Sequence, residues 1–483
     1  MGFAVRRSDR LHVRSPSHSR IDQRTLATPI NAGIEAYVAS TLTGAIIFSK
    51  VHSFHYHNGT LHCEGVKLEQ VAEKFGTPLY VYSAGTILDH YRRLNAALSE
   101  IDHLICYAVK ANSNRSILRL LAQEGAGFDI VSGGELFRVR AARGDPQKCT
   151  FAGVGKSEEE IADALDQRVL SFNVESEAEL IHINRIAGSK GMRAPIAIRV
   201  NPDVETRTHR YISTGRSENK FGIGLNRVAD VYAEAAKMPN IVIRGVQMHI
   251  GSQITDAAPF AEAVAKVTPL VLKLKEQFGL QFFSIGGGIG IIYESSFASG
   301  SSEWWNEKDR VEATTTLPLT IHDYATAILP TLRTLGLRVL LEPGRLLVGN
   351  AGVLLTRVSY IKQAEHKKFV IVDAGMNDLI RPALYQSYHE IVPVREPPNT
   401  KRARADVVGP VCESGDFFAQ DRQLPETREG DLIALMSAGA YGFVMASNYN
   451  SRPLPAEALV KGEQFSLIRR RQRMDDLVRE ECD

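Results

Sequence analysis

Four short segments of the chain carry residues able to do chemistry, and each directly follows an apolar run. They are Tyr107–Asn112 with its Lys110, His249–Gln253, the triple glycine Gly286–Gly288, and Glu342–Arg345. A neutral lysine amine is a nucleophile, and glycine backbone allows N–H groups to approach a phosphate closely. These residue types suggest Schiff-base chemistry beside a phosphate-binding loop.

Each segment also has a plainer interpretation. Lys110 ends the apolar run Ile105–Val109, and apolar surroundings lower an amine's pKa toward the neutral form that Schiff-base chemistry requires. Most lysines are only surface charges, however. A helix after the triple glycine would add the positive end of its dipole to a phosphate site, but an ordinary tight turn explains the glycines equally well. His249 fits an active-site position or a core position, and Glu342 could simply pair with Arg345.

The elements that must position these residues are repeated βα units. Short apolar runs alternate with helical-period segments from about residue 100 to 345, and this pattern over roughly 250 residues predicts a (β/α)8 barrel rather than an open doubly wound sheet. Catalytic groups gather at the C-terminal ends of such strands. The four segments would follow strands one, six, seven and eight. The expected strands are Leu104–Val109, Gly127–Ile130, Cys149–Ala152, Val169–Val174, Pro195–Val200, Val242–His249, Phe282–Ile285 and Val339–Glu342.

Strand-like patterns on both sides of the barrel segment predict a second, β-rich domain of sandwich or barrel type. Strand-like runs lie at Phe54–His57, Leu61–Glu64, Pro78–Ser83, Val353–Ile361, Lys368–Asp373, Ala405–Val411 and Leu432–Ser437. We therefore expect a disordered basic tail at 1–35, the first part of the β domain at 36–85, the barrel at 86–345 and the rest of the β domain at 346–483. The polar stretch Ser295–Thr320 is expected to be an inserted surface loop, and the run Arg469–Arg473 a solvated helix face.

The composition excludes several function classes. With 57 basic and 55 acidic residues, the formal net charge of +2 favours neither nucleic acid nor an anionic membrane. Five widely spaced cysteines argue against a disulfide framework, and no CxxC pair suggests a metal. No apolar stretch approaches the ~20 residues that span a bilayer. We expect a cytoplasmic protein with a small substrate, although the arginine-rich start overlaps the pattern of organellar transit peptides.

Taken together, these segments resemble the alanine-racemase-like (fold type III) barrel decarboxylases that use pyridoxal phosphate. The resemblance covers roughly residues 60–465. It departs from the usual family pattern in the arginine-rich start, in Ile289 after the glycines and in the polar stretch 295–320. Beyond the four segments it rests on Phe128–Leu136, Arg199–Asp203, Glu218–Gly222, Arg381–Tyr385, Gly409–Asp416 and Gly439–Gly442.

The resemblance implies a role for each matching residue. Lys110 would carry the cofactor as a Schiff base, His249 would stack on its ring, and Glu342 would keep the ring nitrogen protonated, which makes the cofactor a better electron sink. Cys412 would return a proton to the reacting carbon. Its loop reaches into the partner's site in this family, so an obligate homodimer is implied; without the flanking motif, a buried structural cysteine would be preferred. Further contacts to the cofactor or its phosphate are implied for Asp129, Ser252, Gly287, Gly288, Gly344, Arg345 and Tyr441.

The substrate is decided within this family by the pocket for its distal end. Arg345 and Arg381 can grip a second carboxylate in bidentate geometry, with Tyr385 and Tyr441 nearby, while Glu413 can pair with a distal ammonium. Ornithine-specific members place Cys-Asp where this chain has Cys-Glu-Ser. The resemblance therefore implies conversion of meso-2,6-diaminopimelate to L-lysine and carbon dioxide, the last step of that lysine route.

Other functions remain open. The nearest is decarboxylation of another basic amino acid, such as ornithine, arginine or carboxynorspermidine, which product identity would distinguish. A racemase is disfavoured because a two-arginine distal site would be superfluous for alanine. A non-catalytic homologue that only binds pyridoxal phosphate or a partner protein is disfavoured because both Lys110 and Cys412 are present.

Overall fold

A computed structural model describes residues 51–205, 220–305, 319–397 and 401–482. The expected basic tail at 1–35 lies outside these ranges, as do residues 36–50 of the predicted β domain and residues 306–318 of the predicted surface loop. Within the described residues, no helix combines the length and apolarity needed to cross a membrane.

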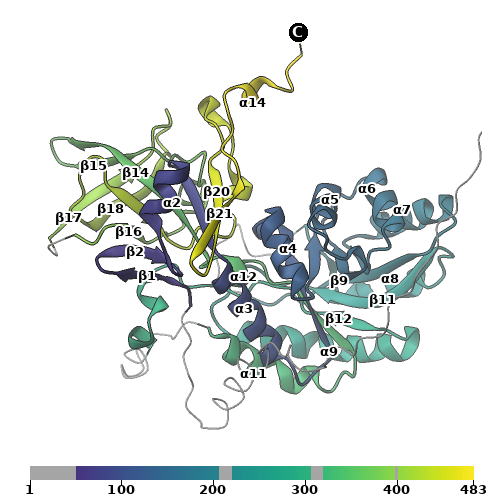
Figure 1. The fold of residues 1–483 in the computed structure, drawn as a ribbon. Coiled ribbons are helices and arrows are strands. Elements are labelled where there is room, and N and C mark those ends of the chain that lie inside the picture. The colour runs from purple at the N-terminus through teal and green to yellow at the C-terminus, as the bar shows by residue number, and fades with distance from the viewer. Residues whose placement is uncertain (1–50, 206–219, 306–318, 398–400, 483) are drawn as a thin grey trace, which may run out of the picture. The chain divides into compact units, whose positions relative to one another are not determined.

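Eight parallel strands close into a barrel within the described part of the chain (Figure 1). Their side chains are almost continuously buried, as expected where a parallel sheet is covered by helices outside and filled by side chains inside. All eight predicted strands are confirmed, with ends that differ by at most two residues. In barrel order they are β5 (His103–Ala108), β6 (Gly127–Ile130), β7 (Cys149–Phe151), β8 (Ser171–Val174), β9 (Ala194–Asn201), β11 (Ile241–Met248), β12 (Phe282–Ser284) and β13 (Arg338–Leu341), which pairs with β5; the short β10 (Ile223–Gly224) adds to β9.

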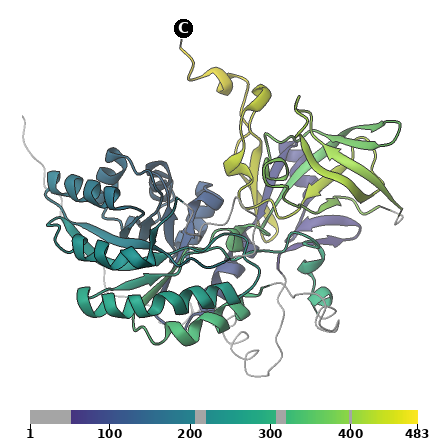
Figure 2. The same cartoon turned by 180° about the vertical axis from the view of Figure 1, so that it is seen from behind.

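Most helices outside the barrel begin with an N-cap residue whose side chain binds the first turn. The side chain of Ser83, Asn114, Ser132, Ser157, Ser176 or Thr320 accepts a hydrogen bond from a first-turn N–H group of the helix that follows it. Helices α9 (Ala258–Phe278) and α11 (Ile321–Leu332) lie side by side (Figures 1 and 2), with their Phe260 and Tyr324 rings 4.9 Å apart. The other helices around the barrel are α3 (Ala84–Ala97), α4 (Arg115–Gln123), α5 (Gly133–Ala141), α6 (Glu158–Asp166), α7 (Glu177–Ser189) and α8 (Leu225–Ala235).

A second sheet is assembled from both ends of the chain. Strand β4 (Leu79–Ser83) pairs antiparallel with β14 (Gly352–Gln363) and parallel with β20 (Ala456–Lys461). The prediction that both chain ends build the β-rich part is therefore confirmed. The sheet also contains β15 (Lys368–Val372), β17 (Arg402–Val408), β18 (Phe417–Pro425) and β21 (Gln464–Arg469), with β16 (Ile391–Pro393) and β19 (Leu432–Leu435) branching from β14.

A small three-stranded antiparallel sheet packs against this sheet. It consists of β1 (Phe54–His57), β2 (Thr60–Cys63) and β3 (Val66–Lys67), followed by α2 (Leu68–Phe75). Leu61 of the small sheet belongs to the same buried cluster as Leu79 and Val353. The arginine run differs from its expectation, because Arg469 ends β21 and residues 470–473 are not helical.

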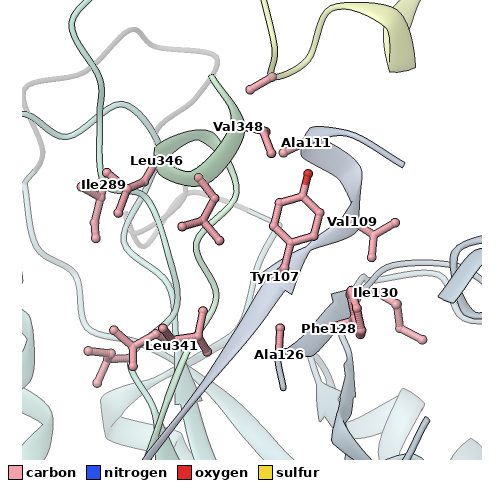
Figure 3. Packing of buried hydrophobic residues seen from close by; sticks show 14 of the residues in the cluster. Tyr107, Val109, Ala111, Ala126, Phe128, Ile130, Ile289, Leu341, Leu346 and Val348 are labelled. Carbon is pink, nitrogen blue, oxygen red and sulfur yellow. The ribbon is translucent and has the colours of Figure 1, made fainter. Parts of the chain in front are cut away.

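The turn after β5 is where the barrel and the second sheet are tied together. The backbone N–H of Tyr441 donates to the carbonyl of Ala111 at 2.8 Å. Asn114 Nδ2 donates at 2.8 Å to the carboxylate of Glu457, a completely buried residue of β20. Figure 3 shows the Tyr107 ring of β5 in the hydrophobic packing below this turn, with its hydroxyl directed toward Ala111. The turn that carries Lys110 is therefore held from both sides.

Candidate active site

Lys110 and Asp129 meet at the C-terminal ends of two neighbouring strands. Lys110 lies in the single 3-10 turn η1 (Val109–Ala111) after β5, and its Nζ donates to Oδ2 of Asp129 in β6 at 2.8 Å. The strand register places Ala108 opposite Asp129. Asp129 is buried, whereas 41% of the Lys110 side chain is exposed. The Lys110 side chain is therefore accessible to a ligand, whereas the Asp129 carboxylate that balances its charge is not.

This ion pair changes the expected charge of Lys110. Crowding by surrounding protein atoms acts to lower the pKa of Lys110, although part of the side chain is reachable. The charge of Asp129 and the hydrogen bond to it act in the opposite direction and prevail, so the pKa lies above its ordinary value. The prediction of a lowered pKa is wrong, because the apolar strand alone did not reveal Asp129.

Glu342 is buried directly after β13 and is held by three barrel residues. Its Oε1 accepts hydrogen bonds from Ser284 Oγ at 2.7 Å and from Asn173 Nδ2 at 3.4 Å, and its Oε2 accepts one from Gln247 Nε2 at 2.9 Å. Burial, and next the charge of Asp129, raise the pKa of Glu342 to about 7. The alternative in which Glu342 only pairs with Arg345 is wrong. A cationic ligand beside this carboxyl would hold it ionised.

His249 follows β11 and is fixed by the glycine loop. Its Nδ1 accepts a hydrogen bond from the N–H of Gly287 at 3.2 Å, so we assign the ring proton to Nε2. Burial, followed by the positive charges of Arg199 and Lys110, lowers the pKa of His249 well below its ordinary value. The imidazole is therefore neutral and held in one orientation.

The glycine loop leaves no space for side chains. A Cβ at Gly287 would lie 2.0 Å from the carbonyl oxygen of Glu342, and one at Gly288 would lie 2.2 Å from that of Gly251. Gly288 also has a φ of +104°, a conformation that L residues rarely adopt. No helix directly follows the glycines to add its dipole to a phosphate site, since residues 289–297 form only a bridge and turns. The backbone, without a helix dipole, must therefore provide any phosphate contacts in this loop.

Arg345 is buried in the one-turn helix α12 (Arg345–Val348) after the motif's Gly344. Its Nη2 donates to Ser252 Oγ at 3.1 Å, and its Nη1 donates to the hydroxyl of Tyr293. The guanidinium also lies 4.9 Å from the centre of the Tyr441 ring. A Cβ at Gly344 would lie 2.9 Å from Cβ of Ala111, which keeps this helix close to the Lys110 turn.

Arg381 lies between β15 and β16 of the second sheet, and its guanidinium faces Tyr293, the tyrosine that accepts a hydrogen bond from Arg345. It begins the short helix α13 (Arg381–Tyr385), and its Nε donates to Nε2 of the buried His389 at 3.4 Å. Its guanidinium lies 5.2 Å from the centre of the Tyr293 ring and 6.0 Å from that of Tyr385. The structure therefore brings Arg345, Arg381 and Tyr385 together, as predicted for a distal-carboxylate pocket.

Cys412 and Glu413 lie apart from this group. Both are exposed, so the alternative of a buried structural Cys412 is wrong. The N–H of Cys412 donates to Asn450 Oδ1 at 3.0 Å, and the Glu413 carboxylate accepts a hydrogen bond from the Tyr449 hydroxyl at 3.5 Å. In the described ranges, their hydrogen bonds are to the second sheet's own loops rather than to Lys110.

Comparisons with known proteins agree with this geometry. The family described as "Pyridoxal-dependent decarboxylase, pyridoxal binding domain" matches residues 84–349. The diaminopimelate decarboxylase of Pseudomonas aeruginosa is 49% identical over 426 residues, which are 88% of this chain and 97% of that protein. That of Vibrio cholerae is 47% identical over 427 residues, again 88% and 97% of the two chains.

This chain belongs to the diaminopimelate decarboxylase family.

Solved structures of this family support the same conclusion. The diaminopimelate decarboxylase of Helicobacter pylori complexed with L-lysine is 42% identical, with a TM-score of 0.78 over 86% of this chain and 98% of that one. The diaminopimelate decarboxylase of M. jannaschii is 37% identical, with a TM-score of 0.81 over 89% and 98%. The predicted family and barrel fold are thus confirmed.

The residues present fit pyridoxal phosphate, the cofactor of the diaminopimelate decarboxylase family. Asp129 Oδ1 and Arg345 Nε are buried polar atoms without a hydrogen-bond partner among the described residues. Such atoms are costly unless a ligand or water satisfies them. These two atoms can bind polar groups of a ligand, the loop at Gly287 can approach a phosphate without steric hindrance from side chains, and the amine of Lys110 is accessible. The site therefore suits a polar, phosphorylated ligand.

Sequence reasoning missed several residues of this site. Gln247 and Ser284 are buried polar side chains of barrel strands, and a buried polar residue needs a partner. Gln247 lies two residues before His249 and so shares its strand face, which was a usable signal. Tyr293 gave no such signal, because it lies in an irregular segment.

Proposed function

We propose that this chain catalyses the pyridoxal-phosphate-dependent decarboxylation of meso-2,6-diaminopimelate to L-lysine and carbon dioxide, the last step of that lysine route. The observation that carries the substrate is the pair of buried arginines, Arg345 and Arg381, on one tyrosine beside the cofactor residues. A buried cationic pair needs an anionic partner, and a second substrate carboxylate is suited to it.

The cofactor end of the site is assigned as follows. Lys110 would hold the cofactor covalently, with Asp129 as the counter-charge of its amine, and His249 would lie against the cofactor ring as a neutral imidazole. Glu342 would bind the protonated ring nitrogen, and that cation would keep its carboxyl ionised despite burial. When bound, pyridoxal phosphate accepts the electron pair left when carbon dioxide departs. The phosphate and its surroundings would be contacted by Ser252, Gly287, Gly288, Gly344, Arg345 and Tyr441.

The substrate end uses residues of the second sheet. Arg345 and Arg381 would bind the distal carboxylate, with Tyr385 and Tyr441 beside it, and Glu413 would pair with the distal ammonium. Cys412 would return a proton to the carbon that has lost carbon dioxide. Orienting the substrate by its far end leaves the carboxylate that departs next to the cofactor.

We also propose a homodimer in which each chain completes the site of the other. The support is the exposed position of Cys412 and Glu413, on loops whose hydrogen bonds do not involve the Lys110 group.

We also propose that the chain divides into a tail at 1–35, a cofactor-binding barrel at 86–345 and a β domain formed by 36–85 and 346–483. A cytoplasmic location is proposed from the five free cysteines.

Product analysis tests this function. Purified protein supplied with pyridoxal phosphate is expected to release equal amounts of L-lysine and carbon dioxide from meso-diaminopimelate. Ornithine, arginine and carboxynorspermidine should give little product, because each lacks the distal carboxylate paired with an ammonium. Lys110→Ala is the matched control and should be inactive. A diamine or agmatine formed faster than L-lysine would contradict the substrate assignment.

A further inference from the structure

Tyr293 lies between the two arginines of the proposed distal pocket. The Arg345 guanidinium is 5.7 Å from the centre of its ring and the Arg381 guanidinium is 5.2 Å from it. The hydroxyl of Tyr293 accepts a hydrogen bond from Arg345 Nη1. One side chain therefore contacts both cations, although α12 of the barrel carries one and α13 of the second sheet carries the other.

Two buried guanidinium groups facing the same ring repel each other, and Tyr293 offsets this repulsion in two ways. Its ring presents negative π-density to the cations, and its hydroxyl gives Arg345 an acceptor. Burial acts to raise the pKa of Tyr293, but Arg345 and then Arg381 lower it by more, so the pKa lies below its ordinary value. The phenol is thus polarised toward negative charge by the two residues it separates.

His389 contacts both Tyr293 and Arg381. Its ring lies edge-on to Tyr293, with the centres 5.4 Å apart. Its Nδ1 lies 2.8 Å from the carbonyl of Met436, so Nδ1 carries the proton and Nε2 accepts from Arg381. Burial, and next Arg381, lower the pKa of His389 to about 3. The neutral His389 accepts a hydrogen bond from Arg381 through Nε2. Arg381 therefore does not compete with Arg345 for the Tyr293 hydroxyl.

We propose that Tyr293 determines specificity for the distal carboxylate by setting the spacing of Arg345 and Arg381, so that both guanidinium groups serve one carboxylate. It acts through the arginines and is therefore a positioning residue. The inference rests on the proposed function, because it takes these arginines as the carboxylate's ligands. A substrate without that carboxylate would gain nothing from the spacing.

The test compares two ligands that differ only in this carboxylate. L-lysine retains it, whereas 1,5-diaminopentane lacks it. Tyr293→Phe keeps the ring and its packing but removes the hydroxyl. We expect KM for diaminopimelate and the inhibition constant of L-lysine each to rise about 10-fold, the scale of a lost hydrogen bond to a charged group. The kcat should stay within about twofold, since the lost interaction is made equally in substrate and transition state. The inhibition constant of 1,5-diaminopentane should not change.

Controls separate this role from a purely structural one. Tyr388→Phe is matched, because Tyr388 also stacks on an arginine, Arg422, at 3.9 Å, and it should leave all constants unchanged. Tyr293→Leu removes the ring as well and should weaken L-lysine further while sparing 1,5-diaminopentane. The cofactor absorbance and the melting temperature of each variant show which is folded, and either variant suffices for the comparison.

The failures of the two proposals are distinguishable. Equal weakening of both ligands, or an unchanged KM together with a reduced kcat, would overturn the role of Tyr293. If the wild-type holoenzyme makes no L-lysine from diaminopimelate, the proposed function fails instead. Calorimetric binding of L-lysine and 1,5-diaminopentane to wild-type and Tyr293→Phe holoenzyme then still decides the inference, since a loss confined to L-lysine would support it.

Discussion

The Lys110 amine and the Asp129 carboxylate form a 2.8 Å ion pair across two neighbouring barrel strands, with the carboxylate buried and the amine partly exposed. This pair raises the pKa of Lys110 although crowding alone would lower it. Asp129 therefore controls how readily the amine becomes a nucleophile.

Asp129→Asn is expected to lower the pKa of Lys110 in the cofactor-free protein, because crowding would then act without its nearest opposing charge. The measurement is the pH dependence of Lys110 acetylation, followed by mass spectrometry, with the exposed Lys237 as an internal reference. The midpoint for Lys110 should move to lower pH, whereas the extent of Lys237 acetylation under each condition should be the same in both proteins. An unmoved midpoint for Lys110 would show that Asp129 does not set its charge.

The pKa of Glu342, raised to about 7, predicts how stability depends on pH. A group whose pKa is higher in the folded than in the unfolded state contributes stability below its unfolded pKa, and this contribution is lost as pH rises through the folded value. In the cofactor-free protein, the loss should fall between about pH 4.5 and pH 7 and amount to roughly 3 kcal/mol. Urea unfolding of wild type and Glu342→Gln at pH 5 and pH 7.5 checks this. The pH-dependent difference between them should vanish if Glu342 carries no such shift.

Gly287→Ala is expected to reduce cofactor affinity strongly, because its Cβ would lie 2.0 Å from the Glu342 carbonyl oxygen and the loop must move to avoid it. A loss of tenfold or more is expected, corresponding to about 1.4 kcal/mol. Titration of apoprotein with pyridoxal phosphate measures it. Gly155→Ala is the matched control, since a Cβ there meets no atom within 4 Å. Equal affinities in both variants would argue against a tight glycine loop.

A shared active site predicts that two inactive variants restore each other. Lys110→Ala and Cys412→Ala chains, co-expressed with different tags and purified as heterodimers, would contain one site with both groups intact. Such heterodimers should show about half the wild-type turnover, because a two-fold symmetric dimer has two equivalent sites. Heterodimers no more active than either parent would place Cys412 outside the partner's site.

The barrel was predictable from sequence because each of its strands is a short apolar run that ends at a polar or glycine residue. Strands β18 and β21 were missed because exposed polar residues interrupt them, although each pairs antiparallel with the strand just before it in the chain. Most of the proposed site residues were found by motif. The Lys110–Asp129 pair depends on strand register, and Tyr293 depends on the approach of Arg381 from another sheet, so neither followed from local pattern.

The pairing of β4 with β20 has a consequence for how the chain is made. Strand β4 is synthesised before the barrel, but its parallel partner, whose Glu457 binds Asn114 beside the Lys110 turn, is synthesised only after all eight barrel strands. Domains generally fold as units during synthesis. Until β20 is synthesised, the Lys110 turn therefore lacks the contact between Asn114 and Glu457, and it is tied to the second sheet by earlier residues such as Tyr441, whose N–H donates to Ala111.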